Sequence, residues 1–248
     1  MRKNIIITGA SSGLGWGMAK EFAAQGSNLG LCARRTDRLN ELKAELEVLH
    51  PQIKVVVHAL DVNDHPEVFK VFKQFKADFG QIDRIIVNAG MGKGASLGTG
   101  HFHANLQTAQ TNFIGALAQS EAALEIFREQ GNGHLVAISS MSALRGMRRA
   151  LNTYAATKAG LASLFEGIRV DLLKTDIKVS TIYPGFIQTE LNAKVKKAPF
   201  MVDLDTGCKQ LAKAINKEPA KAFVPGWPWN LVGLLMKIMP LSWLAKMS

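Results

Sequence analysis

The sequence predicts an α/β fold in which a parallel β-sheet is covered by helices on both faces. Short apolar runs bounded by turn residues alternate with helix-length segments along the 248 residues. Such nearly continuous apolar runs are typical of strands buried on both faces of a parallel sheet. We expect strands at Asn4–Thr8, Asn28–Cys32, Ile53–Leu60, Ile82–Asn88, His134–Ser139, Ile177–Tyr183 and Ala222–Val224. No repeat or linker-like stretch divides the chain, so a single domain is expected.

Two of the intervening segments carry clear helix signals. One begins after Asp64, has Pro66 in its first turn and ends at Gly80, and its buried stripe is formed by Val68, Phe72, Phe75 and Phe79. The other, Arg38–Leu49, repeats leucine at helical spacing and ends before Pro51. Both segments are predicted to cross from one strand to the next.

Composition bounds the class of protein. Hydrophobic residues make up 47% and charged residues 20% of the chain, which excludes a disordered or coiled-coil protein. Cys32 and Cys208 match no disulfide or metal spacing, so a reduced, cytoplasmic location is expected, and the short run after Lys3 predicts no secretion signal. The net charge of +10 favours acidic partners such as phosphate, anionic lipid or an acidic carrier protein. No nucleic-acid partner is predicted.

A glycine-rich turn follows the first strand directly and opens a helix that is expected to continue to about Gln25. Glycines at such a turn permit positive φ and let the backbone approach a pyrophosphate, which the amides at the helix N-terminus then bind. The turn therefore predicts a dinucleotide site. Its candidate binding residues are Gly9, Ser11, Ser12, Gly13, Leu14 and Gly15.

Two arginines stand at the end of the second strand, where an NAD enzyme usually has an acidic residue. Arg34 and Arg35 suit a 2′-phosphate, which they would hold through charge-assisted hydrogen bonds. We therefore expect NADP(H) to be preferred over NAD(H). The alternative is that both arginines merely solvate the start of the Arg38–Leu49 helix.

Several further short motifs follow in a characteristic order. They are the TGxxxGxG pattern at Thr8, Gly9, Gly13 and Gly15, Asp61-Val62, Asn88-Ala89-Gly90, Asn112, Ser140, the YxxxK pattern at Tyr154 and Lys158, and the PGxxxT segment from Pro184 and Gly185 to Thr189, which includes Ile187. Through these motifs most of the chain resembles the short-chain dehydrogenase/reductase family, in its compact single-domain branch. The resemblance implies a Rossmann fold with a seven-stranded parallel sheet in the order 3-2-1-4-5-6-7. It assigns residues 1–226 to the oxidoreductase domain and 227–248 to an apolar helical extension of it.

The resemblance also implies roles for these residues. Asp61 and Val62 would bind the adenine, and Asn88, Ala89 and Gly90 would form a turn beside the cofactor. Pro184, Gly185, Ile187 and Thr189 would also contact the cofactor. Lys158 would hold the nicotinamide ribose, Asn112 would position a water, and the protein would be a homodimer or homotetramer.

The spacing of Tyr154 and Lys158 places both on one face of a helix. A free tyrosine has a pKa of about 10, so we expect the Lys158 ammonium to lower the pKa of Tyr154. Tyr154 would then protonate a carbonyl oxygen that Ser140 holds by a hydrogen bond. Ser140 and Tyr154 are 14 positions apart, one more than the family pattern suggests, and Ser139 and Ser142 are the alternatives for the serine role.

Residues outside these motifs bear on ligands and substrate. His101 and His103 have no third or fourth ligand in the sequence, so no metal site is expected. Apolar and basic residues follow Thr189, and with other apolar residues they favour a lipophilic ketone or aldehyde, although packing of a lid explains them equally well. The residues are Met91, Leu97, Phe186, Leu191, Lys194, Lys196, Lys197, Pro199, Phe200 and Met201.

The segment after Glu218 contains no acidic residue and has a broad apolar face. That face is formed by Trp227, Trp229, Leu231, Leu234, Leu235, Ile238 and Met239, opposite Asn230, Gly233 and Lys237. It would pack on another subunit, close the substrate pocket or contact a membrane peripherally. Lys237 and Pro240 leave it too short to span a bilayer.

The leading functional prediction is an NADPH-dependent carbonyl reductase, or an alcohol dehydrogenase in the reverse direction, acting on a small molecule. A 3-oxoacyl-(carrier protein) reductase and a non-catalytic NADP(H)-sensing protein are the alternatives. The sensor has no need for Ser140, Tyr154 and Lys158 together.

Overall fold

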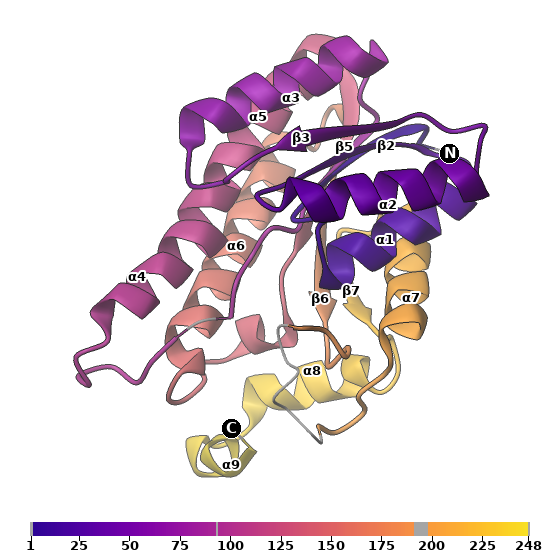
Figure 1. Cartoon of the computed structure of the whole chain (residues 1–248). Helices are drawn as coiled ribbons and strands as arrows, with labels where there is room; N and C mark the ends of the chain where they lie inside the picture. The colour runs from indigo at the N-terminus through magenta and orange to yellow at the C-terminus, as the bar shows by residue number, and fades with distance from the viewer. Residues whose placement is uncertain (1, 93, 191–197, 248) are drawn as a thin grey trace.

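The computed structural model describes residues 2–92, 94–190 and 198–247. These residues form a seven-stranded sheet in the order β3-β2-β1-β4-β5-β6-β7, with each neighbouring pair parallel. The predicted fold class and strand order are confirmed (Figure 1). The strands are β1 (Asn4–Thr8), β2 (Asn28–Ala33), β3 (Val55–Ala59), β4 (Arg84–Val87), β5 (Asn132–Ile138), β6 (Asp176–Pro184) and β7 (Lys221–Val224).

Helices cover both faces of the sheet, and each face has its own hydrophobic core. One core packs α1 (Gly13–Ala24), α2 (Thr36–Leu49) and α7 (Leu204–Asn216) on the sheet. The other packs α3 (His65–Phe79), α5 (Gly115–Gln130) and α6 (Leu151–Asp171) on the opposite face. Burial of apolar side chains on both faces explains why the strands read as continuous apolar runs.

Element boundaries differ from the sequence-based expectations by a few residues. The expected Ile53–Leu60 strand is shortened to β3, and the helix expected from Arg38 begins two residues earlier, at Thr36. The helix after Asp64 is as expected, because the Asp64 carboxylate accepts a hydrogen bond from the Glu67 amide at its start and Gly80 ends it with φ +76°. Apolar periodicity locates helices well but says little about the flanking turns.

The helical stretch that leads into α5 is irregular. Helix α4 (Phe102–Ala109) runs into a single π-helical turn, η1 (Gln110–Ile114), which continues into α5. A second short helix, η2 (Met141–Leu144), follows β5 and has 3₁₀ geometry. Single π-turns inside helices commonly occur at functional sites, and this one contains Asn112.

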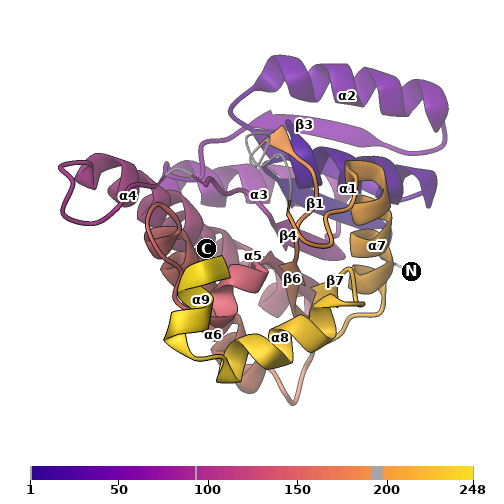
Figure 2. The ribbon, with the colours of Figure 1, turned by 90° about the horizontal axis from the view of Figure 1, so that it is seen from below.

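The extension beyond β7 contains two helices, α8 (Trp229–Ile238) and α9 (Leu241–Met247), separated at Pro240. Both lie at one end of the molecule, below the sheet in Figure 1, and Figure 2 shows them crossing that end. The predicted apolar face of this segment is wrong in part. Trp229 is buried and Gly233 lies on the buried side with it, while Leu234 and Ile238 are exposed.

The reason for this difference is the close approach that Gly233 permits. A Cβ at Gly233 would lie 3.2 Å from the Phe223 ring and 3.3 Å from Leu144. The smallest residue of α8 therefore faces the body of the protein. No helix of the described residues is long and apolar enough to cross a membrane.

Candidate active site

The predicted site residues gather at the carboxyl edge of the sheet. The glycine turn follows β1, the two arginines follow β2, and Asp61 and Val62 follow β3. Asn88–Gly90 follows β4, Ser140 follows β5 and the segment from Pro184 to Thr189 ends β6. In open α/β sheets, ligands bind at this edge, near the point where the strand order reverses beside the first strand.

The glycine turn is fitted closely to the loop after β4. Gly9 and Gly13 have φ values of +64° and +54°, in the left-handed region that favours glycine. A Cβ at Gly9 would lie 2.8 Å from the Ala89 Cα, and one at Gly15 would collide with the Gly9 carbonyl oxygen. Ser12 precedes α1, but its hydroxyl makes no capping hydrogen bond to the helix. The N-terminus of α1 thus remains available to an anion.

Thr8 and Asn88 hold these two loops together. The Thr8 hydroxyl accepts hydrogen bonds from the backbone amides of Asn88 and Ala89, both at 3.0 Å. The Asn88 side-chain amide donates to the Thr8 carbonyl at 2.8 Å. The role of the Thr8 hydroxyl was not predicted, although Thr8 opens the glycine motif.

Arg34 and Arg35 differ in their contacts. Arg35 donates hydrogen bonds to the hydroxyls of Ser11 (3.3 Å) and Ser12 (2.6 Å), so its guanidinium lies over the glycine turn. Arg34 is largely exposed and lies 3.9 Å from the Asp61 carboxylate. Arg35 also lies 3.7 Å from Glu190, which helps to neutralise it. Arg35 therefore links the end of β2 to the phosphate-binding turn, whereas Arg34 lies beside Asp61, which follows β3.

The other residues predicted to bind the cofactor lie in the hydrophobic cores, beside the glycine turn or against α8. Val62 and Ile187 are buried and their side chains belong to the two cores. Thr189 approaches the glycine turn, since a Cβ at Gly13 would lie 3.6 Å from the Thr189 Cβ. Gly185 faces α8, because a Cβ there would collide with the indole ring of Trp229.

Ser140, Tyr154 and Lys158 come together between β5 and α6. Tyr154 interacts with the Ser140 side chain through a hydrogen bond. The Lys158 ammonium lies 5.9 Å from the centre of the Tyr154 ring and donates a 2.8 Å hydrogen bond to the Ile138 carbonyl. Gly90 lies against the same group, since a Cβ there would be 3.5 Å from the Lys158 Nζ.

Burial acts against the expected lowering of the Tyr154 pKa by Lys158. Burial raises the pKa of Tyr154, and the hydrogen bond with Ser140 only partly opposes this. Burial also lowers the pKa of Lys158 to about 8, because a charged ammonium is costly in a desolvated position. Because this pKa still lies above neutral pH, Lys158 remains mostly charged there.

The local hydrogen bonds distinguish the three candidate serines. The Ser139 hydroxyl is buried and donates to the Lys158 carbonyl at 3.0 Å. This hydrogen bond directs the hydroxyl toward the backbone of α6. The Ser142 hydroxyl donates to the Ser140 Oγ at 3.0 Å. Ser140 is therefore the serine that faces Tyr154, and Ser142 supports it.

Asn112 is engaged by the loop after β4. Its Oδ1 accepts a hydrogen bond from the Met91 amide at 2.8 Å, and its Nδ2 donates to the Met91 carbonyl at 2.9 Å. Asn112 is 1% exposed. The sequence does not predict the two hydrogen bonds with Met91, because its backbone and not its side chain makes them.

Three aromatic rings meet where α8 covers the end of β6. Trp229 contacts Phe186 and Phe200 edge-on, with ring centres 5.7 and 6.1 Å apart. The Trp229 indole nitrogen is buried and has no hydrogen-bond partner among the described residues. Leu97 is exposed away from this cluster. Leu191, Lys194, Lys196 and Lys197 lie outside the described residues.

The histidine pair lies apart from the site. The rings of His101 and His103 are 6.3 Å apart at the start of α4. Within the described ranges, no three His, Cys, Asp or Glu side chains are grouped so that they could hold a metal ion.

Comparison with known proteins places the chain among oxidoreductases. The family model described as short chain dehydrogenase matches residues 3–199. The chain is 52% identical over 239 residues to an uncharacterized oxidoreductase of Mycobacterium tuberculosis, covering 96% of this chain and 94% of the relative. It is 32% identical to 11-beta-hydroxysteroid dehydrogenase 1A of Arabidopsis thaliana, covering 91% and 69% of the two chains.

Solved structures show the same fold. The NADPH-dependent 3-quinuclidinone reductase of Rhodotorula rubra superposes with a TM-score of 0.75 at 26% identity, covering 86% of this chain and 82% of the other. An alcohol dehydrogenase of Thermococcus sibiricus complexed with 5-hydroxy-NADP superposes with a TM-score of 0.79 at 24% identity, covering 89% and 95%.

Proposed function

The chain belongs to the short-chain dehydrogenase family, and on that premise we propose that it is an NADPH-dependent carbonyl reductase, or an alcohol dehydrogenase in reverse. The observation that carries this proposal is the grouping of Ser140, Tyr154 and Lys158 beside the glycine turn. We propose that its substrate is a lipophilic ketone, aldehyde or alcohol.

The site fits a dinucleotide. Side chains at Gly9 and Gly15 would close the turn against the backbone, and the N-terminus of α1 carries no side-chain cap. A pyrophosphate would bind to these amides, and the ribose beyond it would lie near Gly90 and Lys158. When bound, a nicotinamide cofactor supplies the hydride that reduces the carbonyl carbon.

The chain's own residues supply the proton and hold the oxygen. As negative charge develops on the substrate oxygen, the Ser140 hydroxyl donates a hydrogen bond to it and the Tyr154 hydroxyl transfers a proton. The raised pKa of Tyr154 keeps its proton in place at neutral pH, which suits reduction. Asn112 acts as a positioning residue that holds the Met91 loop beside Lys158.

The preference for NADP(H) is supported by Arg35. Its hydrogen bonds to Ser11 and Ser12 place a guanidinium beside the phosphate-binding turn, where a 2′-phosphate requires positive charge. No acidic residue occupies the position at the end of β2. The structurally similar 3-quinuclidinone reductase of Rhodotorula rubra is NADPH-dependent.

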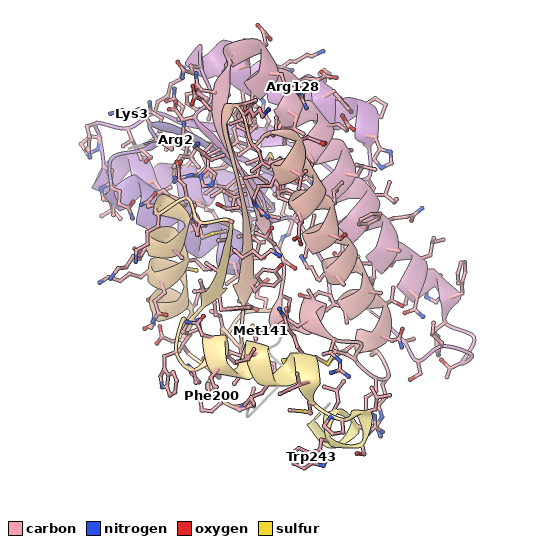
Figure 3. The ribbon with its side chains drawn as sticks, turned by 180° about the vertical axis from the view of Figure 1, so that it is seen from behind. Arg2, Lys3, Arg128, Met141, Phe200 and Trp243 are labelled. Carbon is pink, nitrogen blue, oxygen red and sulfur yellow. The ribbon has the colours of Figure 1, made fainter. Side chains whose placement is uncertain are left out.

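A lipophilic substrate is supported by the aromatic cluster. Trp229, Phe186 and Phe200 bring apolar surface to the end of β6. Trp229 also packs in a small core with Met141, the residue that follows Ser140. Figure 3 shows Met141 lying directly above α8.

A homodimer or homotetramer is also proposed. The outer surface of α6 carries an open groove lined by Phe113, Gly160 and Leu164, among others. Val170 and Leu173 are exposed on the same side of the chain, at the end of α6 and just beyond it. Light scattering of the purified protein measures the subunit number directly.

The decisive experiment measures NADPH oxidation across ketones, aldehydes and quinones for the wild type and Tyr154→Phe. We expect turnover of at least one lipophilic carbonyl by the wild type and a loss of kcat of at least about 100-fold in the variant. Cofactor binding without oxidation of any carbonyl would instead favour the NADP(H)-sensing protein. Turnover confined to acyl carrier substrates, with a rate that falls as salt is added, would favour the carrier-protein reductase.

A further inference from the structure

The end of the molecule formed by α8 and α9 exposes several large apolar side chains. Leu231, Leu234, Leu235 and Ile238 recur at spacings of three, one and three, so they share one face of α8. Their neighbours Trp227 and Trp243 are 77% and 64% exposed. We call this set the tail face; it consists of Phe200, Trp227, Leu231, Leu234, Leu235, Ile238, Leu241 and Trp243.

The tail face is exposed although both helices are held firmly on the protein. The opposite face of α8 is already buried through Trp229 and Met236. The Arg145 guanidinium donates to the carbonyls of Met236, Lys237 and Met239 at the end of α8, at 2.7 to 3.1 Å. Arg148 donates to the Ala245 carbonyl of α9 at 2.5 Å. Turning the helix over would break these contacts, so the tail face is a fixed surface.

The charges around the tail face have one dominant sign. No Asp or Glu follows Glu218 in the chain, whereas the exposed Lys237 does. Arg148 and Arg149 add exposed positive charge from the loop before α6. An acidic group near this end, Glu166, is paired with Lys221 at 2.9 Å.

We propose that the tail face docks on the surface of an anionic lipid bilayer. Exposed apolar patches of this kind mark interaction sites, and an amphipathic helix with tryptophans and basic residues lies in the plane of a membrane interface. Contact with a second copy of the chain is disfavoured by charge. A contact between two copies through this surface would bring the basic residues of both copies, Arg149 and Lys237 among them, close together.

The arrangement in space agrees with this docking. Phe200 and Trp243 lie at the same end of the molecule in Figure 3, while Arg2, Lys3 and Arg128 lie at the other end. Figures 1 and 2 show α8 and α9 together at that end. A bilayer at that end of the molecule would contact α8 and α9. This docking does not require any segment to cross the bilayer.

The test is flotation of the cofactor-free full chain with lipid vesicles, so that its result does not depend on the proposed catalytic function. We expect the wild type to bind vesicles with about one-third phosphatidylglycerol at least about tenfold more strongly than pure phosphatidylcholine vesicles. Binding to the anionic vesicles should fall by at least about tenfold in Leu234→Asp/Ile238→Asp. The matched control, Val48→Asp/Leu49→Asp, replaces two exposed apolar residues at the end of α2 and should bind as the wild type does.

A second variant tests the charge without altering the apolar face. Arg149→Glu/Lys237→Glu reverses two exposed charges and should also weaken binding to anionic vesicles by at least about tenfold. If circular dichroism shows that Leu234→Asp/Ile238→Asp is unfolded, the charge variant tests the proposal in its place. Absence of vesicle binding, or equal binding to both lipids, overturns the proposal. A wild-type oligomer that binds no vesicles and that Leu234→Asp/Ile238→Asp dissociates would identify the tail face as a subunit contact instead.

Discussion

The side chain of Asn112 and the backbone of Met91 bind each other in both directions, with an amide-to-carbonyl hydrogen bond on each side at 2.8 and 2.9 Å. This pair joins the π-helical turn η1 to the loop after β4. It fixes the loop that carries Gly90 against Lys158.

Asn112→Ala should therefore lower both stability and activity. Two backbone groups of Met91 lose their buried partner, which costs about 1–3 kcal/mol in the free energy of unfolding. Urea denaturation measures this loss and steady-state kinetics measures kcat. Asn152→Ala, at an exposed position of α6, is the control and should change neither quantity. A stable Asn112→Ala protein with normal kcat would contradict the positioning role.

Arg35 should determine the cofactor preference. Arg35→Ala removes the guanidinium that binds Ser11 and Ser12, and we expect the Kd of NADPH to rise about 10- to 100-fold, the loss of a charged hydrogen bond. The Kd of NADH should change less than about threefold. Fluorescence titration measures both constants. Arg38→Ala, which removes a nearby arginine paired with Glu41, is the matched control. Equal weakening of both cofactors would show that Arg35 does not contact the 2′-phosphate.

Lys158 should make the cofactor-free protein more stable as the pH rises. The unfolded chain keeps the Lys158 proton up to about pH 10.5, whereas the folded chain begins to release it at about pH 8. Between these values the unfolded state binds more protons, so the free energy of unfolding increases with pH, by up to about 3 kcal/mol in total. The raised pKa of Tyr154 acts in the opposite direction only above about pH 10.

The measurement is urea unfolding of the wild type and of Lys158→Met at several pH values between about 7.5 and 9.5. The difference in unfolding free energy between the two proteins should grow in favour of the wild type across this range. A constant difference would mean that Lys158 keeps its ordinary pKa in the folded protein.

Gly185 should be required for the seating of α8. A Cβ there would collide with the buried Trp229 ring, so Gly185→Ala is expected to destabilise the protein by about 1–3 kcal/mol. Gly226→Ala is the matched control, because the nearest atom to its Cβ would be the Asn230 side-chain nitrogen at 3.6 Å. Thermal unfolding compares the two variants, and equal melting temperatures would contradict the contact.

Arg84 should be a major contributor to stability at the opposite edge of the sheet. Its buried guanidinium donates to the His134 Nδ1 at 2.8 Å and to the Asn216 side chain at 2.7 Å, and lies 3.5 Å from Glu218. Arg84→Ala should cost about 3–5 kcal/mol, because it leaves a cavity and buried polar groups without partners. Arg128→Ala, at an exposed position, should cost less than about 0.5 kcal/mol in the same urea denaturation. Similar losses in both variants would contradict this role.

The order of apolar runs along the chain predicts an α/β fold with a parallel sheet, whereas the strand order was predicted from the resemblance to the short-chain dehydrogenase/reductase family. A parallel strand buried on both faces must be apolar throughout, and the helix-length segments between strands leave few topologies open. The edge at which the site lies follows as well, because every parallel strand points its carboxyl end to the same side. The residues after β1, β4, β5 and β6 therefore had to meet.

Other features arise from contacts between residues far apart in the chain. Arg35 rather than Arg34 reaches the phosphate-binding turn because of its direction at the end of β2. The pKa values of Tyr154 and Lys158 depend on burial, which no spacing reveals. Asn112 is held by the backbone of Met91, and the sequence does not indicate a contact that backbone atoms supply.

The faces of α8 show the same division. Its apolar periodicity is legible in the amino-acid pattern, but both of its faces are rich in apolar residues. Which of them is buried depends on where a glycine allows the helix to approach Phe223 and Leu144. Packing free energy is a property of the assembled surfaces, so the choice of face required the three-dimensional structure.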